Sequence, residues 1–154
     1  MKITNKNTVT TDVEFLRQKS TEVSKEDNEL RKEIKERLLS SFEYYNKKVQ
    51  GIAAPQLKML HRAILVRYEK DAEPKIMFNP KVIFKLGMRA AEERCLSEKD
   101  IPYLMIRPIL SYVSYEDENG NIKKEFLNYK KGRIFCHEVD HLDGILLQDK
   151  GTRI

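Results

Sequence analysis

The sequence contains no run of about 20 consecutive apolar residues, the length that a membrane-spanning helix needs. Its first eleven residues are polar and lack the apolar core of a secretory signal. Only two cysteines occur among 154 residues, which does not indicate the disulfide framework of a small secreted domain. These absences predict a cytoplasmic protein with no membrane partner.

Internal repeats and low-complexity segments are also absent, so the whole chain, 1–154, is expected to form a single domain. Hydrophobic residues make up 40% and charged residues 34%, a balance typical of globular proteins. The net charge of +5 favours acidic partners such as a ribosome surface. The lysines are spread along the chain, however, and no nucleic-acid-binding signature accompanies them. We therefore interpret the charge as solvated surface and expect no DNA binding.

The pattern of apolar residues predicts an α+β fold. A long N-terminal helix should begin after Ser24 as N-cap and end near Lys47 or Lys48, because apolar residues recur there at helical spacing. The Asn119-Gly120 pair favours a hairpin turn. We expect antiparallel β-sheets packed around a C-terminal helix, with strands at 63–68, 75–84, 104–115 and 122–127 and the helix at 129–142.

That C-terminal helix carries the most informative motif, His137-Glu138-Val139-Asp140-His141. Residues four apart lie on one face of a helix, so His137 and His141 can reach the same metal ion. Glu138 is turned about 100° from His137, which suits proton transfer to or from a water better than direct ligation. The alternative is that both histidines are surface residues of a charged helix.

A catalytic metal site typically has three protein ligands and one open position. His61 is expected on the surface, and Asp143 should point away from the ligand face. Cys136 directly precedes His137, so it should also point elsewhere and serve as buried packing. Cys95, in the segment 92–97, remains as the natural third ligand. A thiolate beside two imidazoles suits iron or zinc better than magnesium or calcium.

Three segments together resemble the peptide deformylase family, which removes the formyl group from the N-termini of nascent chains. The family pattern Gly-x-Gly-φ-Ala-Ala-x-Gln is matched by residues 51–56, Glu-Gly-Cys-Leu-Ser by 93–97, and Gln-His-Glu-x-Asp-His-Leu-x-Gly by 137–144. Asn79-Pro80 after an apolar strand also matches the family. Each motif is short, but all three occur in the expected order between about residues 10 and 149.

The resemblance implies a function and a ligand set. The enzyme would hydrolyse the formyl group of formyl-methionyl nascent peptides and release formate. Cys95, His137 and His141 would hold the metal, usually Fe²⁺, and Zn²⁺, Ni²⁺ or Co²⁺ can occupy the same site.

It also implies roles for the remaining site residues. Glu138 would act as general acid/base, and the Gln56 side chain with the Leu96 backbone N–H would stabilise the oxyanion. Asp140 would orient a histidine or brace the helix. Substrate binding would involve Gly51, Ile52, Glu93 and Arg94.

Three positions differ from the family pattern. Val49 replaces the first glycine of the first motif, Arg94 replaces the glycine before Cys95, and Cys136 replaces the glutamine before His137. Arg94 would narrow the substrate cleft, or pair with a substrate carboxylate or with Glu92. The first hypothesis is therefore an active deformylase, and the second is a deformylase-like protein that binds metal or peptide ends with little turnover. A metallopeptidase that cuts ordinary amides is a more distant third.

Overall fold

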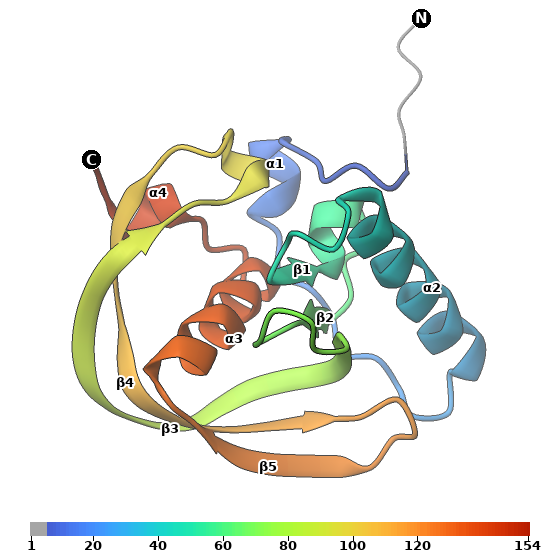
Figure 1. The fold of residues 1–154 in the computed structure, drawn as a ribbon. Coiled ribbons are helices and arrows are strands. Elements are labelled where there is room, and N and C mark those ends of the chain that lie inside the picture. The colour runs from blue at the N-terminus through green and yellow to red at the C-terminus, as the bar shows by residue number, and fades with distance from the viewer. Residues whose placement is uncertain (1–5) are drawn as a thin grey trace, which may run out of the picture.

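A computed structural model describes residues 6–154, and the polar segment at 1–5 lies outside the described residues. The fold is α+β, as predicted: a curved antiparallel sheet surrounds the helix α3, and a second long helix, α2, packs on the other side of the short strands (Figure 1). The α-helices are α1 Val13–Leu16, α2 Asn28–Tyr44, α3 Tyr129–Leu142 and α4 Leu147–Lys150. The strands are β1 Gly51–Ala53, β2 Ala63–Val66, β3 Lys75–Glu93, β4 Tyr103–Glu116, β5 Ile122–Leu127 and β6 Thr152–Arg153, with 3₁₀ turns η1 Ala54–Leu57 and η2 Leu96–Glu98.

All strand pairs are antiparallel, in the order β1-β2-β3-β4-β5, and β6 pairs with the start of β4. Strand β3 uses its first residues to pair with β2 and the rest of its length to pair with β4. The long pair β3–β4 curves around α3 and carries the chain from the bottom of the molecule to the metal ligand segment at the top (Figure 1).

Two hydrophobic clusters lie on opposite faces of β1 and β2. Alternate residues such as Ile52 and Leu65 join the cluster formed with α2. Their neighbours Ala53 and Ile64 join the cluster formed with α3. Because successive strand residues point to opposite faces, three or four residues per strand are enough to attach both helices. This packing fixes α3, and with it the histidines, against the rest of the fold.

Helix α2 differs at both ends from its predicted bounds. Asp27, not Ser24, is the N-cap, and its carboxylate accepts the Leu30 N–H at 3.1 Å. Ser24 Oγ instead donates to Glu26. The helix ends at Tyr44 because Asn46 and Lys47 adopt left-handed backbone conformations, with φ of 56° and 59°.

Strand β3 continues nine residues beyond the predicted end at Phe84. Most residues from Lys81 to Ala90 are exposed on both faces of the sheet, so burial does not alternate there, although Phe84, Leu86 and Met88 alternate with Lys85, Gly87 and Arg89 in the sequence. In contrast, β5 and α3 have the predicted bounds. Within the described residues, no helix is both long enough and apolar enough to cross a membrane.

Candidate metal centre

Helix α3 brings His137 and His141 to the same side, one turn apart. Asn128 caps the helix by accepting the Lys131 N–H at 2.9 Å, and Gly144 follows its C-terminus with φ of 73°. The ring centroids of the two histidines are 5.2 Å apart. Gly144 also lets the chain pass Arg17, because a Cβ at this position would lie 2.3 Å from the Arg17 carbonyl oxygen.

The third predicted ligand, Cys95, lies in a different segment of the chain and faces the two histidines of α3. It lies two residues after the end of β3 at Glu93 and is the N-cap of η2. One ligand atom each from Cys95, His137 and His141 lie within 4.8 Å of one another. Cys95 Sγ and His141 Nε2 are 3.4 Å apart, close to the roughly 3.6 Å expected for sulfur and nitrogen ligands of one tetrahedral ion. The donor set and spacing therefore fit a transition-metal ion.

The other candidates for a third ligand lie outside this group. Asp143 pairs with Arg62 at 3.0 Å, and Cys136 is buried, as expected. Burial raises the pKa of the Cys136 thiol, which favours its neutral form. His61 is half-buried rather than fully on the surface, and its backbone forms a bridge with Thr21.

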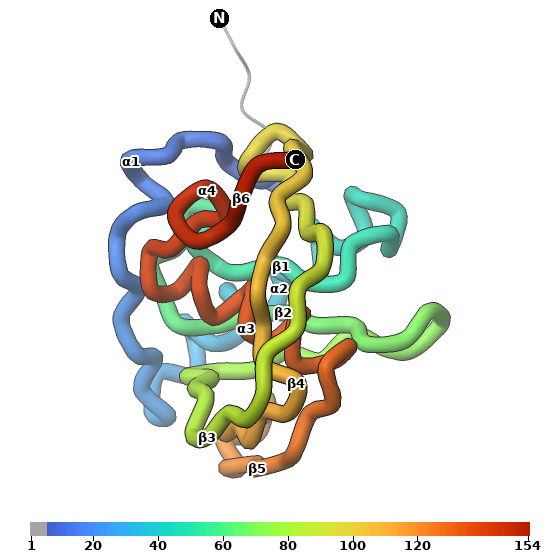
Figure 2. Tube along the Cα trace, turned by 90° about the vertical axis from the view of Figure 1, so that its left-hand side faces the viewer, coloured from blue at the N-terminus to red at the C-terminus, as the bar shows by residue number. Residues whose placement is uncertain are grey.

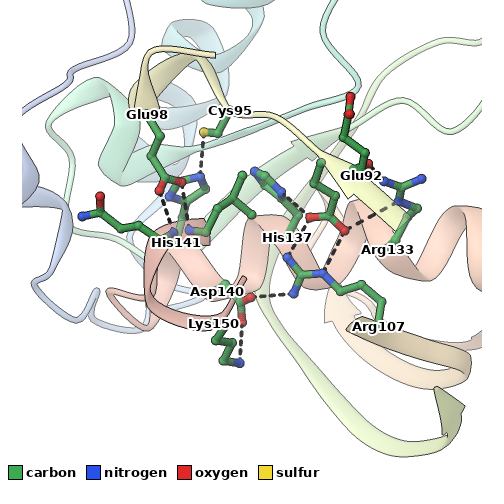
Figure 3. Close-up of polar contacts among 12 residues, drawn as sticks. Glu92, Cys95, Glu98, Arg107, Arg133, His137, Asp140, His141 and Lys150 are labelled. Carbon is green, nitrogen blue, oxygen red and sulfur yellow. Dashed lines mark hydrogen bonds and ion pairs between the residues drawn. The ribbon is translucent and has the colours of Figure 1, made fainter. Parts of the chain in front are cut away.

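A buried network of charged side chains holds the ligands (Figure 3). Glu93 Oε1 contacts His137 Nδ1 at 3.0 Å, which leaves His137 Nε2 to face the site. Arg107 binds the same carboxylate through Nε and Nη2, at 3.1 and 2.9 Å, and binds Asp140 through Nη1 at 2.6 Å. Asp140 thus braces α3 through Arg107. Such partners of a ligating histidine fix its orientation and tautomer.

The pKa of Glu93 reflects this network. Burial alone would raise it, but hydrogen bonds from His137 and Arg107 outweigh burial and hold the pKa at about 2. Burial lowers the pKa of His141 well below its usual value, with the charges of His137 and Arg107 acting in the same direction. A neutral imidazole is the form that ligates a metal.

Glu138 is buried beside the ligands and faces the cleft. Burial raises its pKa to about 7, although the nearby charges of His137 and Arg107 act to lower it. Its Oε1 atom has no hydrogen-bond partner among the described residues. A buried carboxylate oxygen without a partner can exchange a proton with a ligand in the cleft.

Gln56 is held with its amide nitrogen directed at the site. Its Oε1 accepts the Ala53 N–H at 2.9 Å, and its Nε2 donates to Ser97 Oγ at 3.0 Å and contacts Cys95 Sγ at 3.6 Å. Leu96, the first residue of η2, follows Cys95 in the chain. The predicted oxyanion donors therefore lie next to the metal ligands.

A cleft of about 690 Å³ opens onto these residues. Gly51 and Ile52 of β1 line one side, although the Ile52 side chain is buried in the core, so only its backbone is available to a ligand. Glu93 and Arg94 line the other side. The Glu93 carboxylate is engaged by His137 and Arg107, which favours an orienting role over the substrate contact that the sequence suggested.

Arg94 is half-exposed at the rim and does not point at the metal ligands. Its Nε binds Glu92 Oε2 at 3.1 Å, and its Nη1 binds the Asp100 carbonyl at 3.3 Å. Its neighbours Glu93 and Cys95 are buried, so Arg94 occupies the outward position of the extended segment. The pairing with Glu92 is one of the alternatives that the sequence left open.

Arg107 is the functional residue that the motifs did not reveal. It is 4% exposed, in a strand otherwise rich in apolar residues. An arginine at an inward-facing position of such a strand requires a buried carboxylate partner. An arginine within this apolar strand was therefore the sequence feature that could have revealed the buried ion pair.

Comparison with known proteins agrees with the family resemblance of the three sequence motifs. Residues 5–154 match the family model described as polypeptide deformylase. The peptide deformylase of Finegoldia magna is 36% identical over 137 residues, which cover 88% of this chain and 83% of that protein.

Solved structures agree. The crystal structure of peptide deformylase from Thermotoga maritima matches with a TM-score of 0.81 at 31% identity, over 93% of this chain and 94% of that one. A Met-Ala-Ser-bound peptide deformylase of class I type b from Acinetobacter baumannii matches with a TM-score of 0.82 at 25% identity, over 93% and 96% of the two chains.

Proposed function

The chain belongs to the polypeptide deformylase family, and on that premise we propose that it hydrolyses the formyl group of formyl-methionyl peptides with Glu138 as general acid/base. Its activity is that of a peptide deformylase, a metallohydrolase, and its Cys95, His137 and His141 site is intact. The observation that carries the proposal is the convergence of these three ligand atoms within 4.8 Å, beside the buried carboxylate of Glu138.

The bound metal is proposed to be Fe²⁺, with Zn²⁺, Ni²⁺ or Co²⁺ able to use the same ligands. One thiolate and two imidazoles support a transition metal of this kind over Mg²⁺ or Ca²⁺. When bound, such an ion supplies Lewis acidity and lowers the pKa of a coordinated water.

In the proposed reaction Glu138 transfers the proton between the attacking water and the leaving nitrogen. Its carboxylate accepts a proton from the attacking water as the water oxygen bonds to the formyl carbon. It then donates that proton to the peptide nitrogen as the carbon–nitrogen bond breaks, so formate and a free amino terminus leave. The deep position of Glu138 in the cleft and its unpartnered Oε1 atom support this role.

Gln56 and Leu96 are proposed to stabilise the oxyanion that forms on the formyl oxygen. The Gln56 amide is fixed by Ala53 and Ser97, so its N–H group needs little reorganisation before the reaction. Gly51 and Ile52 are proposed to bind the peptide backbone. Strand β1 is at the end of the sheet and, among residues 6–154, pairs with β2 alone, which leaves its other edge for an extended peptide.

The deciding experiment uses anaerobically purified, Fe²⁺-loaded protein, formyl-Met-Ala-Ser and an assay for released formate. The matched control is Glu138→Ala loaded with the same metal. We expect formate release that depends on Glu138. Equal release by the control would remove Glu138 from the mechanism, and no release with one metal bound per chain would favour the second hypothesis, a deformylase-like protein with little turnover.

Two further expectations rest on sequence alone. A ribosome contact is proposed from the net charge of +5, and a cytoplasmic location from the low cysteine content. Co-sedimentation with ribosomes at low and physiological salt tests the first, because a charge-driven contact weakens as salt rises.

A further inference from the structure

The metal ligand Cys95 lies in the connection between β3 and β4, residues 94–102, at the far end of their long antiparallel pair. We call this segment the Cys95 connection. His137 and His141, by contrast, belong to a helix that packs into a hydrophobic cluster. Connections between strands are generally more mobile than the elements they join. The distance from Cys95 to the histidines is therefore only as constant as the Cys95 connection is fixed.

The backbone of the Cys95 connection is strained. Its 3₁₀ turn η2 is followed by Lys99 and Asp100, which adopt left-handed conformations in succession, with φ of 60° and 57°. Neither residue is glycine, and this region is unfavourable for residues that carry a Cβ atom. Such conformations persist where the surrounding structure holds them. We therefore expect contacts with another part of the chain to fix the Cys95 connection.

Glu98, the last residue of η2, makes such a contact. It is only 7% exposed, and each of its carboxylate oxygens accepts one backbone N–H from the start of α4. Oε2 accepts the Leu147 N–H at 2.9 Å, and Oε1 accepts the Gln148 N–H at 3.1 Å. A carboxylate buried away from water is costly unless hydrogen bonds compensate it, and these two bonds do so. Figure 3 shows Glu98 and Cys95 extending from the same short segment toward His141.

Helix α4 contacts both sides of the metal centre. Figure 1 and Figure 2 both place α4 and the Cys95 connection at the same end of the molecule. Leu147 is buried in one hydrophobic cluster with Cys95 and two residues of β4. Lys150 Nζ lies 3.5 Å from a carboxylate oxygen of Asp140 in α3. Helix α4 can therefore fix the Cys95 connection relative to the helix that carries the histidines.

The turn that Glu98 attaches to α4 carries three parts of the site in succession. Cys95 is its N-cap, and Leu96, its first residue, has the N–H group proposed to stabilise the oxyanion. Ser97 Oγ accepts the Gln56 amide N–H at 3.0 Å. A displacement of η2 would therefore move the metal ligand and both oxyanion donors together.

We propose that Glu98 is a positioning residue of the metal centre. Through the N–H groups of Leu147 and Gln148 it holds Cys95 where its thiolate and the two imidazoles can bind one ion. The same bonds hold the Leu96 N–H in place. This inference rests on the metal site of the proposed function, and it assigns a role to a buried carboxylate that directly follows the second sequence motif.

Substitution with Co²⁺ tests the inference without turnover. The visible spectrum of bound Co²⁺ reports its coordination, and the sulfur-to-metal charge-transfer band reports the bond to Cys95. We expect Glu98→Gln, which keeps one acceptor oxygen, to weaken that band. Its Co²⁺ affinity, measured by competition with a chelator, should fall roughly tenfold, since groups that orient metal ligands change affinity by about 10–100-fold. Glu98→Ala, which loses both acceptors, should show a larger loss; if it does not fold, Glu98→Gln decides.

The matched control is Glu116→Gln at the opposite end of β4 from the Cys95 connection. The Glu116 carboxylate also accepts two hydrogen bonds, from Arg31 and Asn79, so its loss should lower stability and leave the Co²⁺ spectrum and affinity unchanged. A wild-type spectrum and affinity in Glu98→Gln would overturn the inference. An equal loss of affinity in the control would also overturn it, because the effect would then be general destabilisation.

Formate release, measured on the same proteins with Fe²⁺, separates this inference from the proposed function. A wild-type protein that binds Co²⁺ through Cys95 but releases no formate would contradict the proposed reaction alone. In that case a loss of Co²⁺ affinity in Glu98→Gln, with none in the control, would still support the positioning role. An active wild-type protein whose Glu98→Gln variant keeps the Co²⁺ spectrum and affinity would contradict the positioning role alone.

Discussion

A Cβ atom at Gly51 would lie 2.5 Å from Oε2 of Glu138, closer than Cβ atoms approach other atoms in proteins. Gly51 is not among the residues with positive φ, so the backbone conformation does not require glycine here. The requirement is steric: β1 lies directly against the carboxylate proposed as acid/base. The side chain allowed at position 51 in the first motif is therefore limited by the position of Glu138 in the third motif.

Gly51→Ala should lower the rate of formate release by displacing Glu138. A displacement of about 1 Å at a reacting group costs on the order of 10²-fold in rate. We expect the loss mainly in kcat, with the bound metal unchanged at one per chain. Steady-state kinetics with formyl-Met-Ala-Ser, together with metal analysis, check this.

Gly120→Ala is the control for the loss of a glycine as such. Gly120 has φ of 82° and nothing within 4 Å of an added Cβ, so alanine there strains the turn without touching the site. It should cost roughly 1 kcal/mol of stability and leave kcat unchanged. Unchanged kcat in Gly51→Ala would mean that Glu138 tolerates the shift or is not the acid/base.

Glu93→Gln should weaken metal binding although Glu93 is not a ligand. Its carboxylate contacts His137 Nδ1 at 3.0 Å and binds Arg107, and partners of this kind change metal affinity by about 10–100-fold. Competition titration with a chromogenic chelator measures the affinity directly. Glu92→Gln, one residue away on the exposed side, should leave the affinity unchanged; a loss of equal size there would indicate general destabilisation.

The sequence was sufficient to predict the two histidine ligands because their spacing is local. His137 and His141 belong to one helix with a clear cap at Asn128 and a clear end at Gly144, and the structure has the predicted bounds. Cys95 required elimination of the other candidates. Its position beside the histidines depends on the long pairing of β3 with β4, which no local pattern encodes.

Two features of the structure were not predicted from the sequence, for different reasons. The end of β3 was missed although Phe84, Leu86 and Met88 alternate with Lys85, Gly87 and Arg89, a strand pattern that the prediction did not follow past Phe84. Arg107 was missed because its partners, Glu93 and Asp140, are 14 and 33 residues away. The outward direction of Arg94 likewise needed the extended backbone around Cys95.

Arg94→Gly should leave kcat/KM for formyl-Met-Ala-Ser within about threefold of the wild type, a difference below 1 kcal/mol. The Arg94 side chain is held by Glu92 and by the Asp100 carbonyl at the rim, away from the metal ligands. Kinetics of both proteins under the same metal loading check this. An increase of tenfold or more in the glycine variant would show that Arg94 obstructs the cleft and would support the hypothesis of a weak enzyme.

Glu116 links α2 to the end of the sheet, and its ionisation should affect stability. It accepts hydrogen bonds from Arg31 at 2.9 Å and from Asn79 at 2.8 Å. Burial would raise the pKa of Glu116, but these bonds from Asn79 and Arg31 outweigh burial and hold the pKa below its usual value. A lowered pKa means that folding favours the carboxylate, so the stabilisation is complete above the unfolded pKa of 4.5 and is lost as pH falls through the lower folded value.

Glu116→Gln should therefore cost about 1 kcal/mol of unfolding free energy at pH 7, with a smaller difference from the wild type below pH 4.5. Urea unfolding of both proteins at several pH values measures this difference. Glu118→Gln is the matched control, because the Lys35–Glu118 pair is 40% and 44% exposed and such pairs contribute little. If the two variants lose the same stability at every pH, the stabilising effect of the Arg31–Glu116–Asn79 contact is no greater than that of an exposed pair, and α2 is attached to the sheet by its apolar face alone.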